Sequence, residues 1–135
     1  MVDLRRTVVA RWLAAGDAGE LDAFDALLDP DVVVHAPAGL STTTLEEEKA
    51  VWEHALAAMP DLHHDVQEVL VNSDGDVEMA RVIVTGTLEG DFGGIRATER
   101  SFRIDQAVIT HLRDGRVAEA WEIADIAALR EQVAD

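Results

Sequence analysis

Hydrophobic and polar residues follow two different periods along this chain. Over the first 60 residues, apolar side chains recur every three or four positions, which predicts helices interrupted by one short strand. The predicted helices span about 3–15, about 18–28 and the stretch between Thr44 and Pro60, and the strand spans 31–37. From residue 61 onward the pattern is typical of strands, separated by the turn sequences NSDGD, EGDFGG and RDG. These strands span about 63–71, 77–88, 99–112 and 116–124, and a short helix follows over about 125–133.

Local signals mark the ends of two of the helices. Thr44 and Glu47 have the spacing of a capping box, and Glu46 and Glu48 favour the positive end of the helix dipole. Gly16 is the expected end of the first helix. The buried stripe of the third helix is expected to consist of Leu45, Trp52, Leu56 and Met59.

Helices that come first and strands that follow predict an α+β fold. We expect a curved, mostly antiparallel sheet packed on the three N-terminal helices. Several strands are apolar on both faces, so we expect one face to contact the helices and the other to be covered by a partner subunit. The chain has 135 residues, of which 48% are hydrophobic, and this predicts one domain over residues 1–135.

Composition and charge exclude several classes of function. The chain has no cysteine, which rules out disulfides and thiol chemistry and, with no apolar run of signal-peptide length, predicts a cytoplasmic protein. The net charge is −16 and the eleven cationic residues are scattered, so we expect neither nucleic acid nor a membrane surface as a partner. Lys49 is the only lysine, which gives little support to Schiff-base chemistry.

Two stretches of the sequence resemble a known family. TGTLEGDFGGI at 85–95 and DGRVAEAWEIAD at 114–125 are similar to motifs of the SnoaL-like polyketide cyclases, a branch of the NTF2-like superfamily. FDALLDPDVVVHAP and MPDLHHDVQEVL fall in the matching order, so the resemblance covers nearly the whole chain. It implies an NTF2-like cone, in which the curved sheet encloses an apolar pocket, and a homodimer formed through the outer face of the sheet.

The resemblance also implies a catalytic pair. In such cyclases an acid after the tryptophan acts as general acid/base and a histidine binds the substrate oxygen; the matching positions are Asp125 and His111. Strand alternation places Asp125 on the same face of its strand as Trp121. On the neighbouring strand it places His111 on the same face as Ile109. Burial would raise the pKa of such an aspartate toward neutrality. Asp125 is equally well placed to cap the last helix, so that alternative stays open.

The remaining candidate residues are expected to bind the substrate. A cone-shaped pocket uses large apolar and aromatic side chains for its walls, although each of them can also belong to the core, and a histidine at the end of a strand can face solvent instead. The candidates are His35, Trp12, Trp52, Trp121, Phe92 and Ile109.

The resemblance therefore implies a small hydrophobic polyketide-like substrate, which is closed into a ring by intramolecular aldol condensation without a cofactor. His63 and His64 do not suggest a metal site, because neighbouring side chains on a strand point to opposite faces. The chain has no tyrosine, which argues against the ketosteroid isomerase-like and scytalone dehydratase-like branches. A cofactor-independent hydroxylase or lyase on a related aromatic substrate, or a non-catalytic binding module, are the alternatives.

Overall fold

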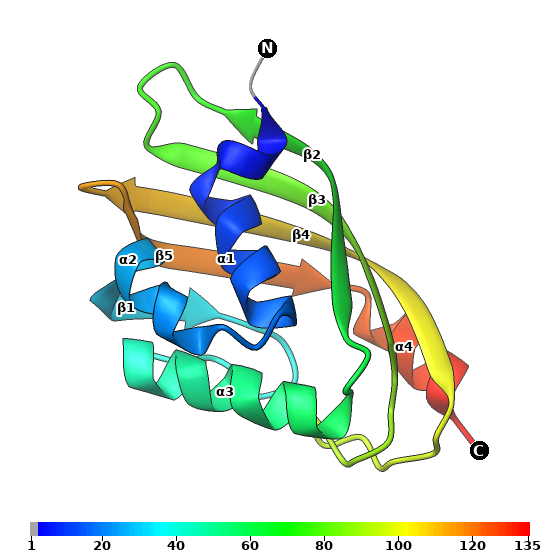
Figure 1. Ribbon diagram of the computed structural model, residues 1–135. Helices are drawn as coiled ribbons and strands as arrows, with labels where there is room; N and C mark the ends of the chain where they lie inside the picture. Colours follow the sequence, from blue (N-terminus) through cyan, green and yellow to red (C-terminus); the bar gives the residue numbers. More distant parts are fainter. Residues whose placement is uncertain (1–2) are drawn as a thin grey trace.

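The structure, a computed structural model, describes residues 3–135 and combines one sheet with short helices (Figure 1). The helices are the 3-10 turns η1 (Leu4–Arg6) and η2 (Leu21–Ala23) and the α-helices α1 (Val8–Asp17), α2 (Phe24–Leu27), α3 (Leu45–Ala58) and α4 (Ile126–Val133). The strands are β1 (Leu28–His35), β2 (His63–Val71), β3 (Val77–Thr87), β4 (Ser101–Arg113) and β5 (Arg116–Ala124).

The five strands form one sheet in the order β1-β5-β4-β3-β2. Strands β2 to β5 are antiparallel neighbours, whereas β1 runs parallel to β5. Helices α1, α2 and α3 cover one face of the curved sheet, and α4 packs at the far end beside β4 (Figure 1). The predicted α+β fold, with a curved sheet against three N-terminal helices and a short C-terminal helix, is confirmed.

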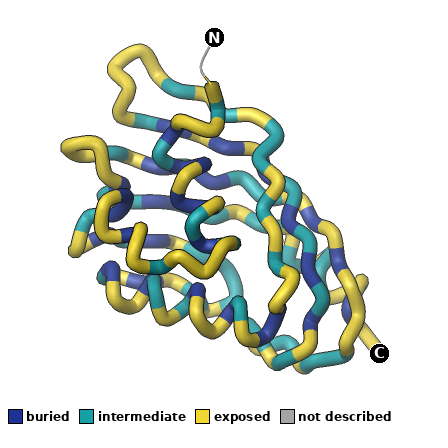
Figure 2. Tube along the Cα trace, viewed as in Figure 1, coloured by how far each residue is buried: buried dark blue, intermediate teal, exposed yellow. Residues whose placement is uncertain are grey.

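The sheet has an inner face toward the helices and an outer face away from them. Along β3, Ala80, Val82 and Val84 are buried, whereas Met79 and Arg81, which alternate with them, are exposed. Buried and less buried residues also alternate along much of β4 (Figure 2). The inner face therefore belongs to the core, and any cavity enclosed by the fold must lie on that side.

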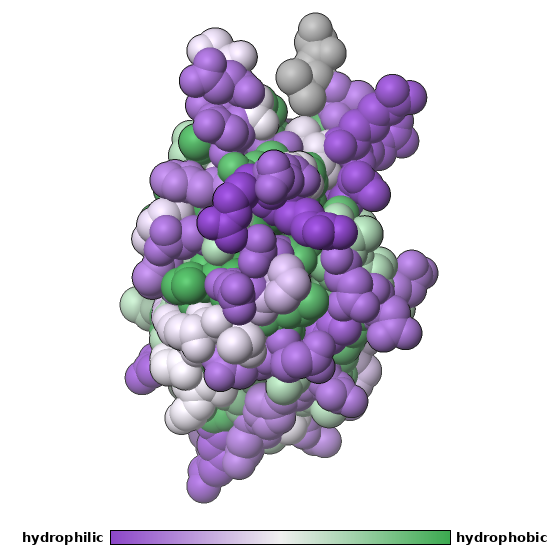
Figure 3. Space-filling view, turned by 90° about the vertical axis from the view of Figure 1, so that its left-hand side faces the viewer, coloured by the Kyte–Doolittle hydropathy of each residue, from purple (hydrophilic) through white to green (hydrophobic). Residues whose placement is uncertain are grey.

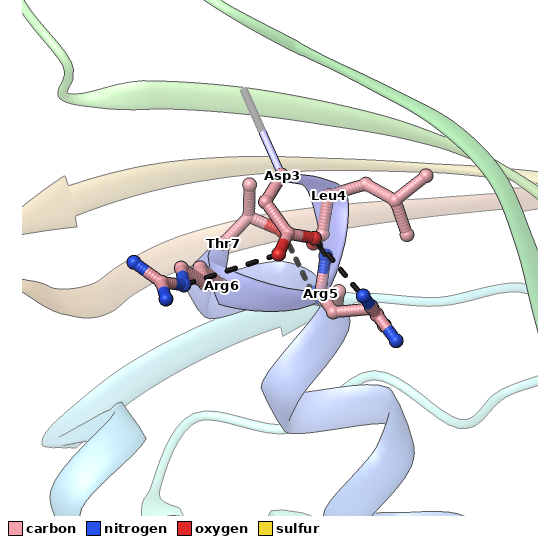
Figure 4. A network of polar contacts seen from close by, with 6 residues as sticks. Asp3, Leu4, Arg5, Arg6 and Thr7 are labelled. Atoms are coloured by element: carbon pink, nitrogen blue, oxygen red, sulfur yellow. Dashed lines mark hydrogen bonds and ion pairs between the residues drawn. The ribbon is translucent and has the colours of Figure 1, made fainter. Parts of the chain in front are cut away.

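The predicted first helix, 3–15, is in fact two elements separated by Thr7. Asp3 caps the 3-10 turn η1, accepting a hydrogen bond from the Arg5 backbone N–H at 3.1 Å, and it lies beside the guanidinium groups of Arg5 and Arg6 (Figure 4). Thr7 is extended and caps α1 with its side chain. Glu78 of β3, which is buried, accepts the Val8 and Val9 N–H groups at 3.2 and 2.8 Å, so the sheet itself completes this helix start.

The prediction that Gly16 ends the first helix is wrong. Gly16 lies buried inside α1, one residue before the helix ends at Asp17. A Cβ at this position would overlap the indole ring of Trp52, so glycine is required for the close approach of α1 and α3. The predicted second helix, 18–28, is also shorter than expected, because β1 already begins at Leu28. Pro30 is tolerated within β1 because that strand is at the sheet edge.

An irregularity in β5 changes which residues share a face. The pairing with β4 shifts between His111–Glu119 and Leu112–Val117, so one additional residue of β5 lies between them. Val117 is consequently fully buried, whereas Glu119 pairs with His111 on the outer face. Regular strand alternation would place Val117 on the same face as Trp121, and the irregularity moves it to the inner face instead.

The surface is dominated by polar side chains, in keeping with the net charge of −16. Hydrophilic residues cover most of the end of the molecule seen in Figure 3, with smaller apolar patches between them. Across residues 3–135, no helix has both the length and the apolar character needed to cross a membrane.

Candidate functional site

A cavity of about 130 Å³ lies between α3 and the inner face of the sheet. Its walls come from α3, four strands, the loops that follow β1 and β3, and α4, and most of them are aliphatic or aromatic. An apolar cavity on the order of 150 Å³ can hold a molecule the size of benzene, so this space accepts about one six-membered ring. The polar groups that reach it are Glu48, His64, Gln106 and Glu122.

Glu122 lies on β5, paired with Val108 of β4, and points to the inner face. The residue is half-buried and lines the cavity. Burial, together with the charge of Glu48, raises the pKa of Glu122 to about 8. At neutral pH this side chain is mostly a neutral carboxylic acid, in the range where a group can both give and take a proton.

Glu48 is the second carboxyl group of the cavity and is only 2% exposed. One of its oxygens accepts a hydrogen bond from the Thr42 hydroxyl at 2.9 Å and the other from the Trp52 indole N–H at 3.1 Å. The pKa of Glu48 is raised by its burial, and these two hydrogen bonds offset only part of the rise. Since both donors stabilise a carboxylate, they favour the negative charge of the pair on Glu48 and the proton on Glu122.

Gln106 of β4 also lines the cavity. Its side-chain oxygen is buried and has no hydrogen-bond partner among residues 3–135. A buried unpaired acceptor costs free energy, which a ligand with a hydroxyl group would recover by donating to it.

His64 of β2 forms the opposite wall, and Asp17 at the end of α1 holds it in place. The Nδ1 atom of His64 lies 2.7 Å from Asp17 Oδ1, and the backbone N–H of His64 donates to Asp17 Oδ2 at 2.6 Å. The ring also lies against Trp52, with 5.2 Å between ring centroids. His63 Nδ1 is 3.5 Å from Asp17 Oδ2, but its side chain is 64% exposed, against 8% for His64. Within the described chain, no three His, Cys, Asp or Glu side chains are arranged to hold a metal ion.

Asp125 is exposed and lies outside the cavity. It is the N-cap of α4, where its carboxylate accepts the Ala128 backbone N–H at 3.0 Å. The alternative that Asp125 caps this helix is therefore confirmed, and the expectation that it is buried in an apolar hollow is wrong.

His111 is exposed on the outer face, with its ring 4.8 Å from that of Trp121. The predicted sharing of a face by His111 and Trp121 is correct, but this face points away from the cavity. A catalytic role for Asp125 and His111 stays a prediction, without the enclosed cavity on which it depended.

Only two of the predicted substrate-binding residues line the cavity, namely Trp52 and Phe92. Trp12 is fully buried in the core, and its indole nitrogen finds no partner within the described residues. His35, Trp121 and Ile109 form one row across the outer face, where the His35 ring stacks on that of Trp121 at 5.3 Å. Trp121 therefore lies on the outer face of the sheet and not inside the cone.

The polar residues of the cavity are not among the predicted site residues, although the sequence around two of them indicates a buried position. Glu48 precedes Trp52 by four residues and therefore belongs to the buried stripe of α3, which the sequence pattern had attributed to apolar residues alone. Glu122 lies between Ala120 and Ala124, whose small side chains leave space beside the strand. The position of His64 depends on the distant Asp17, for which the sequence offers no sign.

Lys49 does not reach the cavity. Its ammonium group lies 2.7 Å from a carboxylate oxygen of Asp25, and this bond raises the pKa of Lys49. A lysine that keeps its proton is a poor nucleophile, which agrees with the low expectation for Schiff-base chemistry.

Comparison with known proteins gives a consistent result. The family model for SnoaL-like polyketide cyclase matches residues 6–133. IdmH of Streptomyces antibioticus, a proposed polyketide cyclase, is 27% identical, with a TM-score of 0.80 over 95% of this chain and 96% of IdmH. TsrD of Streptomyces laurentii is 25% identical, with a TM-score of 0.82 over 94% of this chain and 92% of TsrD. AclR of Streptomyces galilaeus, a proposed hydroxylase, is 22% identical, with a TM-score of 0.78 over 98% and 97% of the two chains, and at this identity the likeness is one of fold. No curated protein matches the chain in sequence.

Exchange of Glu122 for glutamine should flatten part of the dependence of stability on pH. The pKa of Glu122 is about 8 in the folded chain and near 4.5 when exposed, so the stability that its proton provides is complete below about pH 4.5 and is lost as the pH rises through about 8. Relative to wild type, Glu122→Gln should therefore gain free energy of unfolding with rising pH, on the order of a few kcal/mol by pH 9.

Urea denaturation between pH 5 and 9 measures this difference. Glu53→Gln, the same exchange at an exposed position of α3, is the control, and its stability curve should stay parallel to that of wild type. Parallel curves for wild type and Glu122→Gln would contradict the assignment of a raised pKa to Glu122.

Proposed function

The chain belongs to the SnoaL-like polyketide cyclase family, and from this membership we propose that it is an enzyme that closes a ring of a small, hydrophobic, polyketide-like molecule. The proposed reaction is an intramolecular aldol condensation inside the cavity, in which the chain's own side chains exchange the protons. The observation that supports it most directly is the carboxyl group of Glu122, held in an apolar cavity with a pKa of about 8.

The aldol step requires one C–H bond to break and one C–C bond to form. A carbon between two carbonyl groups loses a proton to a base, and the resulting enolate attacks a second carbonyl carbon of the same molecule. The electron pair of that carbonyl moves onto its oxygen, which takes up a proton and becomes a hydroxyl. The site must therefore supply a base and an acid, and a carboxyl group that titrates near neutrality can serve as either. Glu122 is proposed here in place of Asp125.

The apolar walls serve the same reaction. Positioning the two ends of one molecule can supply on the order of 7–11 kcal/mol of the barrier reduction, provided that the reacting atoms are close. Trp52 and Phe92 would confine the chain that folds into a ring, and the unpaired oxygen of Gln106 would accept a hydroxyl or enol proton from it. The volume of the cavity suits the ring being closed.

A test can use a synthetic polyketide methyl ester that carries one activated methylene and one ketone at ring-forming distance. We expect Glu122→Gln to lower kcat by about 10²-fold or more, because glutamine can neither give nor take the proton. Product formation is followed by chromatography and by loss of the methylene signal in the NMR spectrum.

Two variants control this experiment. Glu119→Gln makes the same chemical change on the outer face of β5 and should keep wild-type turnover. Asp125→Asn decides between the two carboxyl groups: a large loss in Asp125→Asn with full activity in Glu122→Gln would overturn the proposal. The rate should be the same under anaerobic conditions, since the aldol step consumes no oxygen; dependence on oxygen would instead favour the hydroxylase alternative.

We also propose that the protein forms a homodimer through the outer face of the sheet. Paired residues on successive strands place Leu70, Met79, Ile109, Trp121 and His35 in one continuous row across all five strands. Leu70 and Met79 are 56% and 40% exposed, and Ile123 in the adjacent row is 60% exposed. Four of the five side chains in this row are large and apolar, and the same row of a second copy would cover them, because a twofold axis brings identical surfaces together.

Analytical ultracentrifugation should give twice the chain mass of 14.7 kDa for wild type. Met79→Glu should give a monomer, since a charge in the middle of the row would be buried without a partner. Ala57→Glu, on the exposed side of α3, makes a comparable change elsewhere and should remain a dimer. A monomeric wild-type protein at micromolar concentration would argue against the dimer.

A further inference from the structure

We propose that His64, held in position by Asp17, is the base that removes the C–H proton of the substrate, and that Glu122 on the opposite wall is the acid that protonates the attacked oxygen. This inference rests on the proposed function and assigns the two proton transfers of that reaction to separate residues. His64 would then be a catalytic residue and Asp17 a positioning residue.

The geometry around Asp17 is the first support. Its carboxylate makes two contacts to the same residue, one to the backbone N–H of His64 and one to the ring, at 2.6 and 2.7 Å. Asp17 is 12% exposed and the His64 side chain 8% exposed, so both partners lie largely out of solvent. Two short hydrogen bonds that one carboxylate accepts fix both the strand and the ring, and they leave the imidazole little freedom to rotate.

The contact with Asp17 also determines which ring nitrogen carries the proton. A carboxylate can only accept a hydrogen bond, so the neutral imidazole keeps its proton on Nδ1, and Nε2 has a free electron pair. His64 lines the cavity, and Nε2 is the nitrogen left for a molecule bound there. Once Nε2 has taken a proton, the negative charge of Asp17 stabilises the imidazolium that results.

Glu122 faces the same cavity from the other side. His64 is on β2 and Glu122 on β5, three strands apart, and their rows meet β4 at Ile104 and Val108, four residues apart. Their backbones are therefore separated by about 14 Å across the sheet and by about 13 Å along the strands. Both residues nevertheless line the same cavity. A substrate there would place its acidic C–H toward β2 and its second carbonyl toward β5.

The charges around the two groups support this division of roles. The ionisable groups nearest to His64 are Asp17 on α1 and its neighbour His63 on β2, while Glu48 on α3 reaches it only through the indole of Trp52. Glu122 faces Glu48, whose hydrogen bonds favour its charged form. At neutral pH Glu122 is therefore mostly protonated and holds a proton to give.

The step balances without another reactant. The C–H proton moves to Nε2 of His64, the electron pair of the C–H bond becomes the new C–C bond, and the carbonyl electron pair becomes an O–H bond with the proton of Glu122. His64 is left as an imidazolium and Glu122 as a carboxylate. Return of the proton from His64 to Glu122, through water after the product leaves, restores both groups.

The first experiment compares His64→Gln with His63→Gln on the polyketide methyl ester described above. We expect His64→Gln to lose at least 10²-fold in kcat, and His63→Gln, the same exchange at the exposed neighbouring position, to stay within about twofold of wild type. Asp17→Asn should lower kcat by about 10²- to 10⁴-fold with little change in KM, because an amide can donate to Nδ1 and so favour the wrong tautomer.

The pH profile separates catalysis from a structural effect. Wild-type kcat/KM should fall as Glu122 loses its proton near pH 8. This fall should be absent from the residual activity of Glu122→Gln and should remain in that of His64→Gln, in which Glu122 is unchanged. A profile that only rises through pH 8 would make Glu122 the base and overturn the assignment.

A readout without turnover completes the test. In ¹⁵N-labelled wild-type protein, the His64 ring should show a proton on Nδ1 and a free Nε2 at pH 8, and Asp17→Asn should change this pattern. A proton on Nε2 in wild type would refute the proposal. Full turnover in His64→Gln and Asp17→Asn with an inactive Glu122→Gln would refute the dyad alone, whereas full turnover in Glu122→Gln would refute the proposed function itself.

Discussion

Two carboxyl groups that share one apolar cavity impose the central constraint on this protein. Burial disfavours the charged form of each group and raises both pKa values, and at Glu122 the charge of Glu48 adds to this effect. The surroundings of the two groups differ. Glu48 receives hydrogen bonds from Thr42 and Trp52, and the pKa of Glu122 is raised to about 8. A side chain that is expensive to bury is thereby turned into a proton donor at neutral pH.

Trp52 connects the parts of the site. Its indole N–H donates to Glu48, its ring lies against His64, and the absence of a side chain at Gly16 lets α1 approach it closely. The same approach brings Asp17, the next residue of α1, to the start of β2, where it holds His64. Trp52 thus contacts both Glu48 and His64, two of the polar residues that line the cavity. The packing of α1 against α3 and the arrangement of these polar groups therefore depend on each other.

The sequence predicts the architecture well and the site poorly, for physical reasons that particular residues illustrate. The four long strands and the helix from Leu45 onward follow from local periodicity and turn signals, and the structure has them within a few residues.

The face of the sheet is harder to predict. Strand alternation predicts correctly that Trp121 and His111 share a face, but the large indole wrongly suggests that this face lines the cavity. The period of a strand gives two faces and does not say which of them the helices cover. That choice is made by the chain as a whole, through the irregularity beside Val117 and the packing of α1 and α3. Glu122 and His64 therefore could not be separated from surface residues by pattern alone, whereas Glu48, in register with Trp52 on one helix, could have been.

The central claim is that Glu122 is protonated in the folded protein at neutral pH. Its most direct test is a ¹³C NMR titration of protein labelled at the glutamate carboxyl carbons, with the Glu122 signal assigned by its loss in Glu122→Gln. The account predicts a midpoint near pH 8 for this signal, and a lower midpoint in Glu48→Gln, where the neighbouring charge is removed. A midpoint near 4.5 in the wild-type protein, unchanged in Glu48→Gln, would contradict it.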